Sequence, residues 1–164
     1  KKLFYNIIYM YPQTHFLFSF FIASIFVKFG IFDYKIAFFV ALAGLLVDID
    51  HFVVFVLRYK EMNIKHAWNR AINGLYKGRS FIHHYIGIIL ITLIIILLYY
   101  YNKTWFWIIG LGYYSHLFMD YTHLNILKIK EKMTIKEFGM IEKINKFEIL
   151  LDIFLIIGII LLFL

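Results

Sequence analysis

Five long apolar stretches constrain this chain more than any other feature of its sequence. They cover residues 14–29, 36–57, 81–101, 104–121 and 147–164. Backbone polar groups cannot stay unpaired in lipid, and the runs are continuous rather than alternating, so each stretch is predicted to be a helix. Because 63% of the residues are hydrophobic and only 16% are charged, a soluble domain could not cover them. We therefore expect an all-α, polytopic membrane helix bundle of about five transmembrane helices. It should form a single integral membrane domain over residues 1–164.

Two longer polar links separate the hairpins of this predicted bundle. Within residues 58–80, apolar side chains recur at helical spacing with Lys and Arg between them, which predicts an amphipathic helix lying in the membrane interface. These apolar residues are Ile64, Ala67, Trp68, Ala71, Ile72 and Leu75. Within residues 127–146, Thr134 and Glu137 form a capping-box pattern, and a second apolar stripe follows. Its members are Ile135, Phe138, Ile141 and Ile144, and they predict a second interfacial helix.

The basic residues fall mainly on one side of the predicted bundle. Of the 17 Lys and Arg residues, 14 lie on the side that holds the N-terminus and the two long links, and three (Lys28, Lys35 and Lys103) lie on the other. The positive-inside rule makes the first side cytoplasmic, in a multi-pass protein of the cell membrane. The net charge of +7 fits contact with anionic membrane lipids. Nucleic acid is not expected as a partner, and the oligomeric state is left open.

The ionisable residues that interrupt the apolar stretches gather at this same side. Each predicted hairpin returns its polar residues to one membrane face, while the opposite face has only Asp33 as an acidic residue. Scattered core histidines would not be expected to sort in this way. The gathered residues are His15, Asp48, Asp50, His51, His83, His84, His116, Asp120, His123, Glu148 and Asp152.

Helical spacing aligns several of these side chains. His116, Asp120 and His123 stand at i, i+4 and i+7, so they share one stripe, and Asp48 and His51 stand at i and i+3. Neutral imidazoles and carboxylates are ligands for zinc, manganese or iron(II) when thiolates are absent, and the chain has no cysteine. We therefore expect a divalent metal, zinc before manganese or iron. A satisfied network of His–Asp pairs that ties helices together is the alternative.

The candidate ligands outnumber the four positions of one tetrahedral metal site. Either some of them contact the ligands rather than the metal, or two ions are bound. Asp50 is expected to point away from the Asp48 stripe, toward a second ion or as an orienting partner. Glu148 and Asp152 could join the site or pair with basic residues of the neighbouring links. A carboxylate near lipid costs several kcal/mol, and a divalent cation compensates it more fully than neutral histidines. A two-metal site would suit phosphate ester hydrolysis.

Four motifs in this order resemble those of the YdjM-like family of LexA-regulated, membrane-bound, metal-dependent hydrolases. They are Thr14-His15, Asp48-Ile49-Asp50-His51, Arg79-Ser80-Phe81-Ile82-His83-His84 and Ser115-His116-Leu117-Phe118-Met119-Asp120-Tyr121-Thr122. The third departs from the family pattern, because Ile82 replaces a threonine, His84 replaces a serine and Gly78 replaces a histidine. The resemblance covers about residues 14–123.

The resemblance implies a metal-dependent hydrolase. The His-x-x-x-Asp element is also similar to one in zinc-dependent phospholipase C, which implies a lipid or membrane-proximal phosphate ester as substrate. Asp50 or His84 would be the general base, and Arg79 would clamp a phosphate, its alternative role being a positive-inside anchor. The predicted metal ligands are His15, Asp48, His51, His83, His116, Asp120 and His123.

A divalent metal-ion binding or transport protein is the second hypothesis, and a structural helix-tying network is the third. Transporters need access from both faces, and here one face is nearly empty of polar residues. Several enzyme classes lack their signatures: the sequence has no His-Glu-x-x-His, no Gly-x-Ser-x-Gly and no Walker loop.

Overall fold

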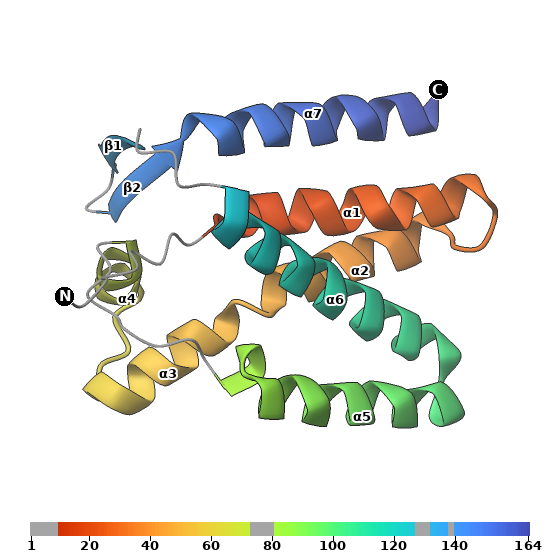
Figure 1. Cartoon of the computed structure of the whole chain (residues 1–164), viewed down its shortest axis with the longest axis horizontal. Coiled ribbons are helices and arrows are strands. Elements are labelled where there is room, and N and C mark those ends of the chain that lie inside the picture. Colours follow the sequence, from red (N-terminus) through yellow and green to blue (C-terminus); the bar gives the residue numbers. More distant parts are fainter. Residues whose placement is uncertain (1–9, 73–80, 127–131, 138–139) are drawn as a thin grey trace.

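The centre of the fold is a group of three mutually contacting helices, α1 (Pro12–Lys28), α2 (Tyr34–Leu46) and α6 (Lys103–Ile126) (Figure 1). The computed structural model describes residues 10–72, 81–126, 132–137 and 140–164. Pro12 opens α1 at a position where no backbone N–H is needed. Asp33 caps α2 by accepting from the Ile36 amide at 2.7 Å.

Two further helices lie on opposite sides of this group (Figure 1). Helix α5 (Tyr85–Tyr101), preceded by the short 3₁₀ turn η1 (Phe81–His83), packs on α6 through Ile95, Tyr113 and Leu117. Helix α7 (Lys146–Phe163) packs on α1. The prediction that all five apolar stretches are helical is therefore confirmed, although the second is not a single helix.

The second apolar stretch differs from the prediction. It was expected to be one helix over residues 36–57, but a turn at Val47 and Asp48 separates α2 from α3 (Ile49–Tyr59). Figure 1 shows the interruption between the two parts.

A side chain from another helix accounts for this break. In a continuous helix, the Asp48 amide would donate to the Gly44 carbonyl, four residues earlier. Here it donates to the Leu45 carbonyl at 3.4 Å, and the Gly44 carbonyl accepts from the His116 ring at 2.9 Å instead. Side chains that enter the backbone ladder in this way are a recognised cause of kinks.

The two polar links fold differently from each other. Helix α4 (Ile64–Ile72) confirms a helix in the first link. In the second link the predicted helix is wrong, because strands β1 (Lys132–Glu137) and β2 (Met140–Asn145) pair as an antiparallel hairpin. The β-branched residues Thr134, Ile135, Ile141 and Ile144 favour strands, and the sequence has a glycine, a poor helix former, at position 139. The fold is thus helical with one short hairpin.

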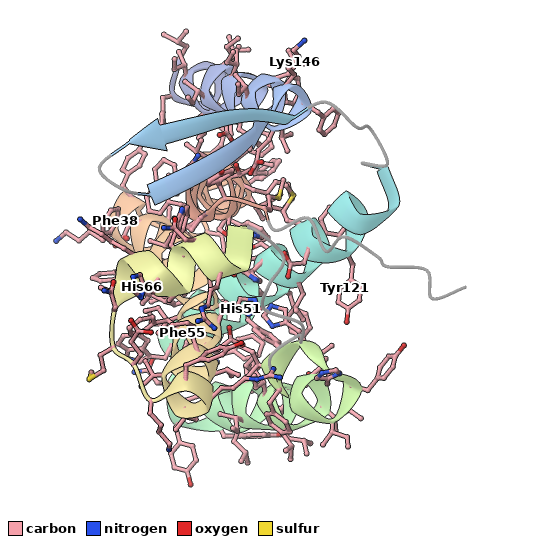
Figure 2. The ribbon with its side chains drawn as sticks, turned by 90° about the vertical axis from the view of Figure 1, so that its left-hand side faces the viewer. Phe38, His51, Phe55, His66, Tyr121 and Lys146 are labelled. Carbon is pink, nitrogen blue, oxygen red and sulfur yellow. The ribbon has the colours of Figure 1, made fainter. Side chains whose placement is uncertain are left out.

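Within the described residues, the distribution of polarity is that of a membrane protein. Large apolar side chains of α5 and α7 are exposed, among them Ile86 and Phe154, as expected where lipid is the solvent. Figure 2 shows side chains that project outward from both helices. The buried polar residues are Thr14, His15, Ser19, Ser24, His83, Ser115, His116 and Glu148. By length and composition, one described segment, Tyr34–Tyr59, can cross a membrane, and Tyr85–Tyr101 is a shorter apolar helix.

Candidate metal centre

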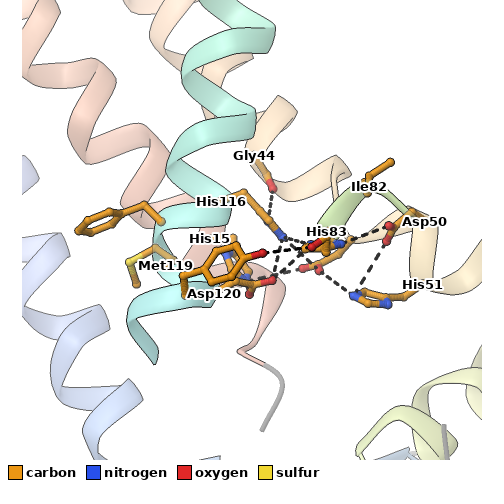
Figure 3. Close-up of polar contacts among 12 residues, drawn as sticks. His15, Gly44, Asp50, His51, Ile82, His83, His116, Met119 and Asp120 are labelled. Carbon is orange, nitrogen blue, oxygen red and sulfur yellow. Dashed lines mark hydrogen bonds and ion pairs between the residues drawn. The ribbon is translucent and has the colours of Figure 1, made fainter. Parts of the chain in front are cut away.

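The predicted polar residues converge where α1 begins, α2 gives way to α3, and η1 meets α6 (Figure 3). His15 lies in the first turn of α1 and His83 lies in η1. The junction of α2 and α3 holds Asp48, Asp50 and His51, and the C-terminal half of α6 holds His116 and Asp120. Residues more than a hundred positions apart thus meet in one cluster, which we call the His–Asp cluster.

His116 is fixed most firmly of these side chains. It is fully buried, and its Nδ1 lies 2.9 Å from the Gly44 carbonyl oxygen. Because a carbonyl only accepts hydrogen bonds, Nδ1 carries the proton and the neutral ring presents the lone pair of Nε2. That nitrogen faces carboxylate oxygens of Asp48 at 3.6 Å and Asp120 at 3.7 Å. Histidine ligands of metals are oriented in this manner by backbone carbonyls.

His15 lies against His116 and faces the same two carboxylates. The two rings stack with centroids 3.9 Å apart, and His15 Nε2 is 3.4 Å from Asp120 Oδ1 and 3.9 Å from Asp48 Oδ2. Zinc bonds of 2.0–2.2 Å in a tetrahedron separate neighbouring ligands by about 3.3–3.6 Å. The four distances between these rings and carboxylates, 3.4–3.9 Å, are close to that spacing. The residues present therefore fit a divalent metal.

His83, Asp50 and His51 form a second group beside the first. His83 Nδ1 is 3.4 Å from Asp50 Oδ2, and His51 Nε2 is 4.0 Å from Asp50 Oδ1. The His51 and His83 rings stack with centroids 5.3 Å apart. On its other side, His83 Nε2 lies 3.2 Å from His116 Nε2 and 3.3 Å from Asp120 Oδ2. Asp50 therefore points toward His83, which is the direction expected of an orienting partner or of a ligand to a second ion.

The carboxylates of the cluster lack sufficient compensation among the described residues. Asp48 Oδ2 and both oxygens of Asp50 are buried and have no hydrogen-bond partner there. Burying ionised groups without partners costs several kcal/mol or more. Asp48 and Asp50 thus leave buried carboxylate oxygens beside ring nitrogens, and a cation would compensate their charge.

Small residues allow the helices to approach closely enough for this geometry. A Cβ on Gly112 would stand 2.7 Å from the Ala43 Cβ and 2.8 Å from the Val40 carbonyl oxygen. Next to it, the hydroxyls of Ser19 and Ser115 hydrogen-bond to each other at 2.6 Å. Small residues with hydroxyl contacts are typical of helix packing in membranes. Apart from Ser115, which opens the fourth motif, none of these residues belongs to a pattern that the sequence made conspicuous.

Three predicted site residues are not placed in the cluster. His84 is exposed at the N-cap position of α5, next to the buried His83. Arg79 lies outside the described residues. His123 belongs to α6, but its side chain lies outside the described part of the chain. Their predicted roles stay predictions.

Glu148 takes a role that the sequence did not reveal. It is buried at the start of α7, and its Oε1 accepts from the Tyr11 amide at 2.6 Å and from the Thr14 hydroxyl at 3.1 Å. Thr14 directly precedes His15. Glu148 therefore holds the first turn of α1, which presents His15. Asp152, one turn further along α7, has one buried oxygen without a hydrogen-bond partner among the described residues.

Replacing Glu148 with alanine is expected to destabilise the fold by about 1–3 kcal/mol, because the buried Tyr11 amide loses its acceptor. Metal affinity should fall as well, since the turn that carries His15 loosens. Thermal unfolding in detergent and a metal-binding titration measure the two effects. Glu61→Ala is the matched control, because Glu61 pairs with the exposed His66, and it should change stability by less than about 0.5 kcal/mol. Equal effects of the two variants would contradict this role.

The fold and the site define a class of protein: a helical membrane protein with a histidine–aspartate cluster among its helix ends. Residues 10–125 match the family described as YdjM inner membrane protein, and the chain belongs to that family. The match includes all four motifs on which the resemblance rests and does not extend to the hairpin or α7. No curated protein and no solved structure matches the chain.

Proposed function

We propose that this protein is a metal-dependent hydrolase that cleaves a phosphate ester of a lipid or another molecule at the membrane surface. The observation that carries the proposal is the convergence of the His116 Nε2 lone pair with carboxylate oxygens of Asp48 and Asp120. Lone pairs and negative charges held together in a buried place favour a cation. The nitrogen and oxygen donors suit zinc, with manganese or iron(II) as alternatives.

The metal would supply Lewis acidity and lower the pKa of a coordinated water. His15, His116, Asp48 and Asp120 would hold it, and the Gly44 carbonyl keeps His116 in the correct tautomer. Asp50 would orient or join the ligands through His83. The candidates for the general base that takes a proton from water are Asp50, within the cluster, and His84, which follows the buried His83 in the chain. Arg79 would bind the substrate phosphate.

A multi-pass arrangement with the cluster facing the cytoplasm is part of the proposal. The first turn of α1, which holds His15, and the η1 turn before α5, which holds His83, lie at the same side of the bundle (Figure 1). The links predicted for that side hold most of the Lys and Arg residues. The positive-inside rule then directs the cluster to the cytoplasm. A substrate would reach it from the cytoplasmic leaflet or from solution.

Phosphate release by the purified full chain tests the proposal. With zinc or manganese, we expect chelator-sensitive release of phosphate from a phosphatidic acid or soluble phosphomonoester panel, and loss of that release in Asp120→Asn. Asp33→Asn serves as the matched control, because Asp33 caps the other end of α2 and asparagine caps equally well. Release that ignores both the chelator and Asp120→Asn would contradict the proposal.

Divalent metal transport is the second candidate, and the break between α2 and α3 favours it. Transporters place ion sites at interrupted helices, and Asp48 lies in this interruption. The hydrolase ranks first, because the opposite side of the bundle offers only Asp33 as an acidic residue in the sequence. Metal uptake into proteoliposomes that depends on Asp48 would reverse the order.

A further inference from the structure

We propose that the His–Asp cluster is a two-ion centre, an inference that rests on the proposed metal-dependent function. Two groups of side chains each place their ligand atoms within 4.8 Å of one another. The first group is His15, His116 and Asp120, and the second is Asp50, His51 and His83. Figure 3 shows the two groups side by side, with His83 between His116 and Asp50.

Asp48 lies between the groups and can serve both. Its Oδ1 is 3.6 Å from His116 Nε2, in the first group, and 3.9 Å from His51 Nε2, in the second. Its Oδ2 is turned toward His15 and has no hydrogen-bond partner among the described residues. A carboxylate placed in this way could be shared by two ions, which are typically about 3.5–4 Å apart in two-metal phosphatases and nucleases.

Asp120 makes a similar link. Its Oδ1 is 3.4 Å from His15 Nε2, while its Oδ2 is 3.3 Å from His83 Nε2. The two nitrogens of His83 thus face different groups, because Nδ1 is directed at Asp50. If Nδ1 binds the second ion, then Nε2 carries a proton and donates to Asp120, which satisfies both nitrogens.

A single-ion arrangement would reverse the His83 tautomer. His83 Nε2 would join His15 and His116 around one ion, and Nδ1 would donate to Asp50. That arrangement leaves His51 without an ion and leaves the site negative, because three carboxylates outweigh one divalent cation. Two divalent cations make the site net positive, which suits an anionic phosphate ester. The balance of charge therefore favours two ions.

Counting metal equivalents tests the inference. The full chain in detergent, stripped with a chelator, is titrated with Zn²⁺, and bound metal is measured by elemental mass spectrometry after buffer exchange. We expect two equivalents for the wild type and for His66→Gln, whose ring is 60% exposed and pairs with Glu61. Asp50→Asn and His51→Gln should each fall to one. Loading with Mn²⁺ should give the electron paramagnetic resonance spectrum of an exchange-coupled pair in the wild type, and uncoupled manganese in Asp50→Asn.

The possible outcomes separate this inference from the proposed function. One equivalent in the wild type that Asp50→Asn retains would mean a single ion with Asp50 orienting His83. It would overturn the two-ion centre and leave a metal-dependent hydrolase intact. Protein that binds neither Zn²⁺ nor Mn²⁺ would overturn both. The wild-type count decides the question even if a variant fails to fold.

Discussion

Replacing Asp120 with asparagine is expected to weaken divalent metal binding by more than about 100-fold and to abolish hydrolysis. Replacing a residue that hydrogen-bonds to a metal ligand already lowers metal affinity by about 10- to 100-fold. Asp120 is proposed to bind the metal itself, so its replacement should cost more. Its two oxygens lie 3.3–3.7 Å from ring nitrogens of His15, His83 and His116. Asparagine keeps the shape and removes the charge, so the loss reports on the anionic ligand itself. Isothermal titration with Zn²⁺ measures the affinity.

Asp33→Asn controls for the general effect of removing a carboxylate. Asp33 lies at the opposite end of α2 from Asp48, and its carboxylate caps that helix. We expect its metal affinity to equal that of the wild type. If Asp120→Asn bound metal as tightly as Asp33→Asn, Asp120 would not be a ligand, and other residues would hold the metal.

The second large effect is expected from Gly112→Ala, a change of one methyl group. The added Cβ would meet the Ala43 Cβ, the Val40 carbonyl oxygen and the Gly44 amide nitrogen at 2.7–2.9 Å. Two of these atoms are backbone, so α2 and α6 must separate. Overpacking of this kind costs about 1–3 kcal/mol. The separation also breaks the bond from His116 to the Gly44 carbonyl, so metal binding should fall together with thermal stability.

Gly110→Ala is the matched control for this prediction, since it makes the same change two residues earlier on α6. There the added Cβ would meet a side-chain methyl of Ile95 at 3.3 Å, which can shift. Alanine also favours a helix over glycine by up to about 1 kcal/mol. Gly110→Ala should therefore be neutral or stabilising. Equal unfolding temperatures for the two variants would contradict the close approach of α2 and α6 at Gly112.

The positions of the helices and the members of the cluster could be predicted from the sequence, because lipid imposes long apolar runs and makes every ionisable interruption conspicuous. His15, Asp48, His83, His116 and Asp120 are such interruptions. The prediction that they gather at one side of the bundle followed from the hairpin arrangement, in which alternate helix ends lie at the same membrane face. These predictions needed no side-chain geometry.

The break between α2 and α3 could not be predicted, because its cause lies in another helix. Residues 36–57 are apolar without interruption by proline, so local propensity favours one continuous helix. The break depends on His116, seventy-two residues from Gly44, which takes the Gly44 carbonyl. Such long-range hydrogen bonds leave no local pattern in the sequence.

Two other features were missed for related reasons. In the second link, Thr134 and Glu137 match a helix start, but pairing between β1 and β2 satisfies the same backbone groups. The partners of Glu148 are a backbone amide and the Thr14 hydroxyl, 134 residues away in the chain. Every residue except proline has a backbone amide, so no pattern of residue types could predict that Glu148 binds this one.

The most direct test of a metal centre is the metal content of the purified protein, measured by elemental mass spectrometry for the wild type beside His116→Ala and His66→Ala. We expect bound metal in stoichiometric amount in the wild type and in His66→Ala, and its loss in His116→Ala. Wild-type protein that remains metal-free after incubation with zinc, manganese and iron(II) would contradict the metal centre. It would leave the His–Asp cluster as a structural network.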